Sequence, residues 1–270
     1  MTRYLLSRSG REALAEFVRA DVLLGFDFDG TLAPIVGRRN GAGMRPATRR
    51  LLRAVARRYP CIVISGRARA DVMRRLGAVG VVMVVGNHGL EPGWATAELR
   101  GVIRAWRGRL RRELRGWNGV QIEDKAFSLA VHYRAAADPR GALAAIVNAA
   151  GALPGARTIG GKMVVNVLPA GVPLKGVALE EQRARCGCAA ALYVGDDETD
   201  EDVFALDLPG RLLAVRVGWS RASAAPWFLR SQGEVDELLR VLVARRAAAP
   251  IAPAAPTAPT APTGTPAPTA

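Results

Sequence analysis

Residues 22–32 read Val-Leu-Leu-Gly-Phe-Asp-Phe-Asp-Gly-Thr-Leu, an apolar run followed by two aspartates one residue apart. The apolar run is typical of a buried strand. In an extended chain, side chains two residues apart point to the same face, so Asp27 and Asp29 meet one ligand while Phe28 points into the core. Beyond them, Thr31 follows a glycine and offers donors to phosphate oxygens. The stretch predicts a phosphoryl-transfer site at the end of a strand.

Taken alone, the Asp-x-Asp pattern also fits a turn with capping carboxylates. Three other segments favour the phosphoryl-transfer interpretation. Residues 62–65 form a short apolar run that ends in Ser65 and is followed by Arg67, and Lys175 stands at the start of a predicted helix. A further apolar run ends in a cluster of carboxylates, at Asp196, Asp197 and Asp200. Acid, hydroxyl, lysine and acid in this order form a specific pattern.

Lysine is rare in this chain. Of its 38 basic residues, only three are lysines, namely Lys125, Lys162 and Lys175. Where an arginine-rich chain still uses lysine, a compact ammonium group is favoured over a planar fork. We therefore predict that all three lysines serve the site, and we extend the prediction to the two histidines, His88 and His132. Chance placement and ordinary polar roles near a sheet are the alternatives.

Helix-like and strand-like patterns alternate along most of the chain, which favours a parallel α/β core. The predicted core elements are a helix over 46–59, a strand over 61–64, a helix over 69–76, a strand over 81–85, a helix from 176 and a strand over 191–194. The intervening part has a helix, paired strands over 120–123 and 126–134, a helix over 139–150 and a strand near 163–168. We predict a core made of residues 1–101 and 171–247, with an inserted α+β cap over 102–170.

The predicted strand 126–134 has two different faces. Its odd-numbered apolar residues share one face, which packs, while Ser128, His132 and Arg134 share the other. Lys162 and Asn166 likewise have the same parity on the later strand. Together with Glu123 and Lys125, these polar groups would suit sugar hydroxyls, and a merely solvated sheet face is the alternative.

Composition limits the class of protein. A chain of 270 residues with 50% hydrophobic content can bury a core. Its three cysteines include Cys186 and Cys188, whose spacing is too short for ordinary zinc pairs, so we predict reduced thiols in a cytoplasmic protein. The N-terminal residues lack a signal-peptide core, and no apolar run approaches the roughly 20 residues of a membrane helix. We expect a soluble protein without a membrane partner.

The net charge of +14 raises nucleic acid as a partner. The densest arginine cluster, over residues 100–115, carries apolar residues at helical spacing, at Ile103, Trp106, Leu110 and Leu114. The arginines therefore take the opposite, solvated face of a helix, and no aromatic residues alternate with them as in single-strand binders. We expect no nucleic-acid partner, and we expect the basic charge to attract anionic sugar phosphates.

The end of the sequence differs in composition from the rest. From residue 248 onward it consists of Ala, Pro and Thr in near-repeats. We predict a disordered tail over 248–270 without catalytic content.

The four polar strand and helix ends resemble the motifs of the haloacid dehalogenase (HAD) superfamily of phosphohydrolases. Within it, residues 23–242 are similar to the trehalose 6-phosphate phosphatases. The family-specific stretches are 86–91 (Gly-Asn-His-Gly-Leu-Glu), 123–134, 161–165 and 195–204. The resemblance implies a magnesium-dependent hydrolase with a Rossmann-like parallel-sheet core and a mobile cap that grips the disaccharide.

The resemblance also implies a role for each matching residue. Asp27 would attack phosphorus to form an aspartyl-phosphate, and Asp29 would be the general acid and base. Ser65 and Lys175 would hold the phosphoryl oxygens. Magnesium would be bound by the carboxylates of Asp27 and Asp196 and the backbone carbonyl of Asp29, with Asp197 and Asp200 behind them. The implied substrate-binding residues are Thr31, Arg67, Asn87, His88, Glu123, Lys125, His132, Arg134, Lys162 and Asn166.

Asn166 departs from the family pattern, which usually has a glutamate at this position, and Leu168 is more apolar than expected. An amide lacks the charge-assisted strength of a carboxylate toward sugar hydroxyls. A related sugar phosphate, such as a pseudo-disaccharide phosphate, is therefore the alternative substrate. A non-catalytic partner of a trehalose-phosphate synthase is a rival class, as is a nucleic-acid binder. A degenerate enzyme should have lost one of the four motif residues, and none is missing.

Overall fold

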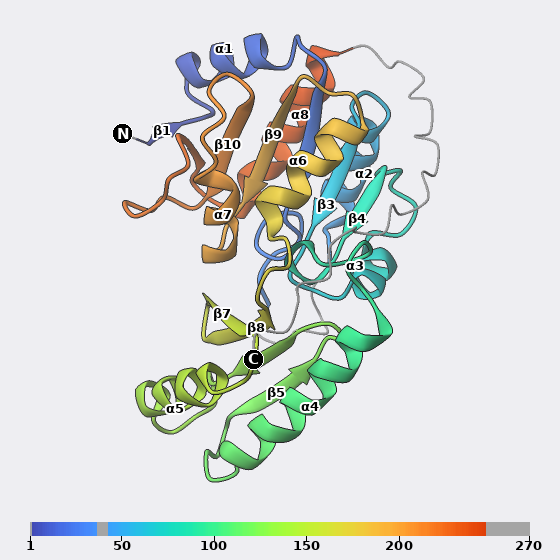
Figure 1. Cartoon of the computed structure of the whole chain (residues 1–270). Coiled ribbons are helices and arrows are strands. Elements are labelled where there is room, and N and C mark those ends of the chain that lie inside the picture. The colour runs from blue at the N-terminus through green and yellow to red at the C-terminus, as the bar shows by residue number, and fades with distance from the viewer. Residues whose placement is uncertain (1, 37–42, 247–270) are drawn as a thin grey trace.

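The computed structural model describes residues 2–36 and 43–246, and the predicted tail over 248–270 lies outside them (Figure 1). The described residues form a large parallel α/β core and, below it in the view of Figure 1, a smaller unit with its own sheet. Within this part of the chain, none of the helices combines the length and the apolar character needed to cross a membrane.

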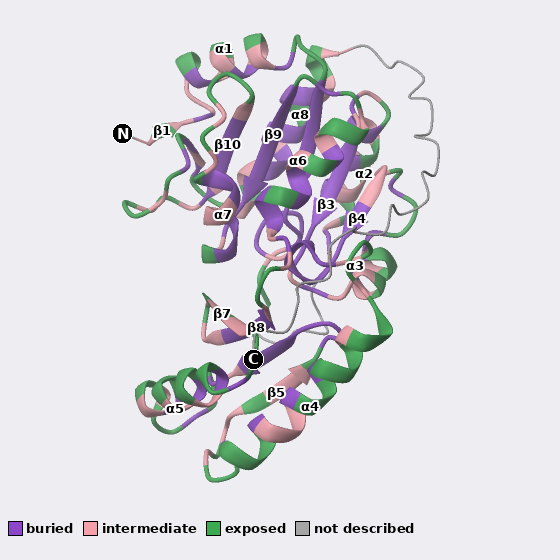
Figure 2. Ribbon diagram, viewed as in Figure 1, coloured by how far each residue is buried: buried purple, intermediate pink, exposed green. Residues whose placement is uncertain are grey.

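The core sheet has seven strands in the order β1-β11-β10-β9-β2-β3-β4, and all its pairings are parallel. Its strands are β1 (Arg3–Tyr4), β2 (Val22–Phe26), β3 (Cys61–Ile64), β4 (Met83–Val85), β9 (Ala190–Gly195), β10 (Leu212–Val217) and β11 (Trp227–Leu229). Strand β2, between β9 and β3, is buried along its whole length, as its apolar sequence predicts (Figure 2).

Helices cover both faces of this sheet, and the alternation along β2 shows how. Leu24 and Phe26 belong to one apolar cluster, which also holds residues of α1, α2 and α8. Leu23 points to the other face and packs in a second cluster, with α6 and α7. The helices are α1 (Arg8–Phe17), α2 (Pro46–Ala56), α3 (Arg69–Leu76), α6 (Lys175–Arg185), α7 (Glu201–Phe204) and α8 (Val235–Arg245).

The inserted unit is an antiparallel sheet with two helices. Its strands β5 (Gln121–Asp124), β6 (Leu129–His132), β7 (Ala156–Gly161) and β8 (Val164–Pro169) lie in the order β5-β6-β8-β7. Helices α4 (Ala97–Glu113) and α5 (Pro139–Gly151) pack on one face of the sheet. The four apolar residues predicted to line one side of the arginine-rich helix are all buried there, at Ile103, Trp106, Leu110 and Leu114.

Most predicted core elements are confirmed, and four carry errors at their ends, including β9, which runs over 190–195 rather than 191–194. The strands over 22–26 and 61–64 and the helix over 69–76 have the predicted bounds. Helix α2 ends at Ala56 rather than at residue 59, and β4 begins at Met83 rather than at 81. Helix α6 begins one residue early, at Lys175. These ends are set by local turns, which apolar patterns do not mark.

Larger errors lie in the inserted unit. Strand β7 was not predicted, because Ala-Arg-Thr-Ile-Gly-Gly over 156–161 has little alternation and gains its hydrogen bonds as an edge strand of β8. The predicted strand 126–134 is shorter, since Ala126 has a φ of +71° and turns the chain before Leu129. The unit begins with α4 at Ala97 and its sheet ends at Pro169, whereas the predicted cap spans 102–170.

Candidate active site

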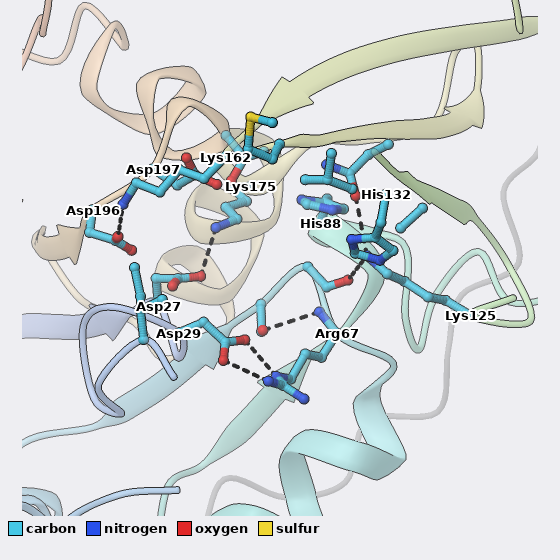
Figure 3. Close-up of a pocket in the computed structure, with 18 of the residues that line it drawn as sticks. Asp27, Asp29, Arg67, His88, Lys125, His132, Lys162, Lys175, Asp196 and Asp197 are labelled. Atoms are coloured by element: carbon cyan, nitrogen blue, oxygen red, sulfur yellow. Dashed lines mark hydrogen bonds and ion pairs between the residues drawn. The ribbon is translucent and has the colours of Figure 1, made fainter. Parts of the chain in front are cut away.

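The predicted catalytic groups meet at one edge of the core sheet. Asp27, Ser65 and Asp196 follow the strands β2, β3 and β9, which are neighbours in the sheet. The carboxyl ends of parallel strands lie at the same edge, so these side chains converge there. Lys175 enters from the first turn of α6 (Figure 3). A cavity of about 260 Å³ separates this edge from the sheet of the inserted unit.

The cavity gathers most of the predicted site residues. Both histidines and all three lysines of the chain line it, as the sequence predicted. The predicted residues in its lining are Asp27, Asp29, Ser65, Arg67, His88, Lys125, His132, Arg134, Lys162, Asn166, Lys175, Asp196 and Asp197. Four predicted residues are not part of the lining, namely Thr31, Asn87, Glu123 and Asp200.

Lys175 is the most deeply buried of the lysines in the site. Its ammonium donates to Oδ1 of Asp27 at 2.8 Å and to Oδ1 of Asp200 at 2.7 Å, and its side chain is 2% exposed. Burial alone would lower the pKa of Lys175, but the two carboxylates outweigh burial and hold that pKa above its usual value. The lysine is therefore charged and stands beside Asp27.

Asp200 organises the acidic loop rather than the cavity. Its Oδ2 accepts hydrogen bonds from the backbone N–H groups of Asp196 and Asp197, each at 2.9 Å. Its Oδ1 accepts from the hydroxyl of Tyr193 at 2.8 Å, in addition to Lys175. Both oxygens of Asp200 are therefore engaged in contacts within the protein.

The acidic groups fit a divalent cation. One carboxylate oxygen from each of Asp27, Asp196 and Asp200 lies within 4.8 Å of the others. The Oδ1 atom of Asp196 is buried and has no hydrogen-bond partner among the described residues. Burial raises the pKa of Asp196 to about 6, and a cation beside this carboxylate would favour its ionised form. An unpartnered buried oxygen in a group of carboxylates is a donor set that Mg²⁺ prefers.

Gly30 permits the close approach of the two loops that carry these acids. Its φ is +84°, and a Cβ atom at this position would collide with the carboxylate of Asp196. The backbone N–H of Gly30 donates to the carbonyl of Ala33, which closes a tight turn after β2. The glycine after the Asp-x-Asp is thus required both by its backbone conformation and by its packing.

Asp29 is held by Arg67. The Nε and Nη2 atoms of the guanidinium donate to Oδ2 and Oδ1 of Asp29 at 2.5 and 2.7 Å (Figure 3). Arg67 follows β3, and its backbone N–H also donates to the hydroxyl of Ser65 at 3.2 Å. Arg67 was predicted to bind substrate, and the structure adds that it holds the carboxylate of Asp29.

Asn87 joins the core to the inserted unit and does not face the cavity. Its side-chain N–H donates to the carbonyl of Lys125 at 3.1 Å, and its side-chain oxygen accepts from the hydroxyl of Ser128 at 2.5 Å. Asn87 is fully buried. The prediction that it binds substrate is therefore corrected, because the tertiary contact with residues 125–128 uses its amide.

Lys162 lies at a hairpin tip and reaches the core. It was predicted to share a strand with Asn166, but residues 162–163 form the turn between β7 and β8. Its ammonium donates to Oδ2 of Asp196 at 2.6 Å (Figure 3). Lys162 therefore links the inserted unit to a carboxylate of the acidic group.

The inserted unit presents further polar groups to the cavity. Lys125 donates to the carbonyl of Gly66 at 2.7 Å and to Oδ1 of Asn166 at 3.2 Å. Glu123 is not part of the lining, and its carboxylate lies 3.0 Å from Nε2 of His132. Arg134 lies beyond the end of β6, is exposed and lines the cavity.

Several participants were not predicted. Tyr193 belongs to a buried apolar strand, and its hydroxyl gains a role only through contact with Asp200. Thr199 and Met163 also line the cavity; both lie within family-specific stretches of the sequence but were not singled out. Asp71 binds Arg67 with its Oδ2 atom 2.8 Å from Nη1. Asp71 lies in the first turn of α3, where an acidic residue is usually explained by its favourable interaction with the helix dipole.

Known proteins are similar to this chain in sequence. The sequence profile of the trehalose-phosphatase family matches residues 25–232. A trehalose-phosphate phosphatase of Mycolicibacterium paratuberculosis is 39% identical over 194 residues, covering 66% of this chain and 49% of the relative. One from Mycobacterium tuberculosis is 34% identical over 244 residues, covering 84% of this chain and 62% of the relative. The chain thus spans between about half and three fifths of these relatives.

The fold also matches a solved structure. The C-terminal domain of the trehalose-6-phosphate phosphatase of Candida albicans superposes with a TM-score of 0.76 at 22% identity. The alignment covers 92% of this chain and 100% of that domain. At this identity the likeness concerns the fold, and it places the parallel core and the inserted unit together in one known architecture.

Proposed function

The chain belongs to the trehalose-phosphatase family, and from this premise we propose that it hydrolyses trehalose 6-phosphate to trehalose and phosphate. The observation that carries the proposal is the meeting of Asp27, Asp29 and Lys175 in one cavity whose opposite wall is polar. The wall formed by the core has the groups for phosphoryl transfer. The wall formed by the inserted unit has groups that bind hydroxyls.

In the first step a carboxylate oxygen of Asp27 attacks phosphorus and the bond to the sugar oxygen breaks. The product is an aspartyl-phosphate, so one difficult displacement becomes two easier ones. Asp27 is 5% exposed and is held by Lys175, which fixes its position before attack. Asp29 gives a proton to the departing sugar oxygen, which leaves as an alcohol. The second step hydrolyses the aspartyl-phosphate, with Asp29 taking a proton from the attacking water.

Charge on the transferring group is offset by fixed donors. Lys175 and Ser65 line the same cavity as Asp27, and we propose that they bind the phosphoryl oxygens. Mg²⁺ would be held by Asp27, Asp196 and the backbone carbonyl of Asp29, with Asp197 and Asp200 behind them. When bound, it supplies positive charge that reduces repulsion between an anionic nucleophile and an anionic phosphate.

The sugar is assigned to the inserted unit, from α4 to β8, which acts as a cap. Its lining groups, Lys125, His132, Arg134, Lys162 and Asn166, can donate to or accept from hydroxyls. Asn166 accepts a hydrogen bond from Lys125, where a carboxylate would form a charge-assisted pair. This contact favours a second candidate, a phosphatase for a related sugar or pseudo-disaccharide phosphate.

We further propose a cytoplasmic location and a trehalose-phosphate synthase as the enzyme that supplies the substrate. The location is supported by the cysteines, since Cys61, Cys186 and Cys188 are all free thiols. The synthase is proposed because an enzyme must form trehalose 6-phosphate before this chain can hydrolyse it.

Phosphate release from a panel of esters tests the proposed function. The panel holds trehalose 6-phosphate, glucose 6-phosphate, other disaccharide phosphates and p-nitrophenyl phosphate, each with Mg²⁺ and with a chelator. We expect kcat/KM for trehalose 6-phosphate to exceed that for the other sugar phosphates by about tenfold or more, with loss of activity in the chelator. A preference for another sugar phosphate would transfer the mechanism to the second candidate. Hydrolysis of no ester would contradict both.

Glu123→Ala tests the assignment of the sugar to the cap. Glu123 contacts His132, so its removal is expected to raise KM for trehalose 6-phosphate about tenfold, which corresponds to about 1.4 kcal/mol. Hydrolysis of p-nitrophenyl phosphate should change by less than about twofold, because this ester has no sugar to bind. Steady-state kinetics with both substrates provide the measurement.

Two further variants serve as comparisons for Glu123→Ala. Glu113→Ala removes an exposed glutamate of the same unit and is the matched control. Lys125→Met should lower kcat/KM for both substrates. The reason is that Lys125 donates to the carbonyl of Gly66, which lies between Ser65 and Arg67 in the chain. If Glu123→Ala lowers activity equally toward both esters, the cap does not select the sugar through this pair.

A further inference from the structure

Arg67 is a buried arginine that binds the more exposed carboxylate of Asp29. The two hydrogen bonds from its guanidinium use both oxygens of the carboxylate. The side chain of Arg67 is 5% exposed, whereas that of Asp29 is 37% exposed. The buried arginine therefore sets the orientation of the more exposed carboxylate.

Asp71 holds Arg67 from another side. Its Oδ2 accepts from Nη1 of Arg67 at 2.8 Å and from Nε of Arg75 at 2.9 Å, and its Oδ1 accepts from Nη2 of Arg74 at 3.0 Å. Burial raises the pKa of Asp71, but hydrogen bonds and charges from Arg75 and Arg67 outweigh burial and hold that pKa below its usual value. The carboxylate is ionised and is itself fixed to α3.

A carboxylate at one edge of a guanidinium does not by itself fix an arginine, whose side chain has many rotamers. Two carboxylates bound to different nitrogens fix the position and the plane of the fork. We propose that Asp71 is a positioning residue, which acts through Arg67 to aim the carboxyl group of Asp29 at the oxygen of the leaving group. The inference rests on the proposed function, because that function assigns proton transfer to Asp29.

The chemistry of the first step makes the inference testable. The P–O bond breaks while the carboxyl O–H of Asp29 passes its proton to the same oxygen, and the leaving group departs as a neutral alcohol or phenol. A nitrophenolate is a stable anion and needs little of this proton, whereas a sugar alkoxide needs all of it. A misdirected Asp29 must therefore harm esters of alcohols more than esters of acidic phenols.

The experiment compares Asp71→Asn with the wild-type chain on a series of phosphate monoesters in Mg²⁺. The leaving groups run from p-nitrophenol through phenol to simple alcohols and trehalose. For each ester the ratio of kcat/KM between variant and wild type is taken, so that differences in binding between esters cancel. We expect the ratio to fall by less than about twofold for p-nitrophenyl phosphate and by about tenfold to thirtyfold for the alcohol esters.

Controls separate positioning from a general effect on the fold. Arg74→Gln removes an exposed partner of Asp71 and should leave all ratios unchanged, while Asp71→Glu keeps the carboxylate and should recover part of the loss. Thermal melting identifies an unfolded variant, in which case Asp71→Glu and Asp71→Ser carry the comparison. Equal loss on every ester, or no loss on any, would overturn the inference. If the wild type acts on aryl and alkyl esters but not on trehalose 6-phosphate, the substrate is wrong and the inference still stands on the series.

Discussion

Asp27→Asn is expected to abolish turnover of every phosphate ester while leaving the protein folded. An amide is not a nucleophile toward phosphorus, so no aspartyl-phosphate forms, and loss of a nucleophile typically lowers kcat by about 10⁴-fold or more. The fold should tolerate the change because Lys175 keeps its contact with Asp200 at 2.7 Å. We expect the free energy of unfolding to change by less than about 1.5 kcal/mol.

The measurement for Asp27→Asn is phosphate release from trehalose 6-phosphate and p-nitrophenyl phosphate, together with a urea unfolding curve for each protein. Asp207→Asn makes the same chemical change at an exposed aspartate of the core and is the matched control. Retention of more than a hundredth of wild-type activity in Asp27→Asn would assign the attack on phosphorus to another group. Loss of the folded state in Asp27→Asn would show that Asp27 is required for the stability of the fold.

Lys175→Met is expected to reduce both activity and stability. The ammonium lies between the buried carboxylates of Asp27 and Asp200, and its removal leaves them uncompensated. Breaking a buried ion pair by removing one partner typically costs about 3–5 kcal/mol. Turnover should also fall, because the variant loses the proposed donor to the phosphoryl oxygens.

Urea unfolding in a chelator measures the loss of stability in Lys175→Met. The double variant with Asp27→Asn removes one of the two carboxylates and should recover about 1–2 kcal/mol, since less uncompensated charge stays buried. Arg185→Met removes an exposed cation from the last turn of the same helix and should cost less than about 0.5 kcal/mol. Lys175→Met with the stability of Arg185→Met would mean that the buried carboxylates do not need this lysine.

The catalytic edge of the core was predictable because its signals are local. Apolar runs of strand length that end in Asp27, Ser65 and Asp196 mark both the strand and the residue at its carboxyl end. The rarity of lysine in an arginine-rich chain added a second local signal, and all three lysines line the cavity. Helical spacing likewise predicted the buried face of α4, where Ile103 and Trp106 pack.

The cap was less predictable because its contacts join distant segments. Strand β7 exists through its pairing with β8, and Lys162 turns away from the strand at the hairpin tip. Asn87 meets residues about 40 positions later in the sequence, and this contact removes it from the cavity lining. No pattern in either segment specifies the other.

The sequence by itself determined the parallel core, the identity of the groups at its strand ends and the buried stripe of the long helix. These follow from the periodicity of side chains along one segment, which a linear pattern records. Only the tertiary structure decided which charged groups pair. Arg67 pairs with Asp29, 38 positions away in the sequence, and Lys162 pairs with Asp196, 34 positions away. Such pairs form where folding brings side chains within about 3 Å and excludes water, and that geometry depends on the packing of the whole chain.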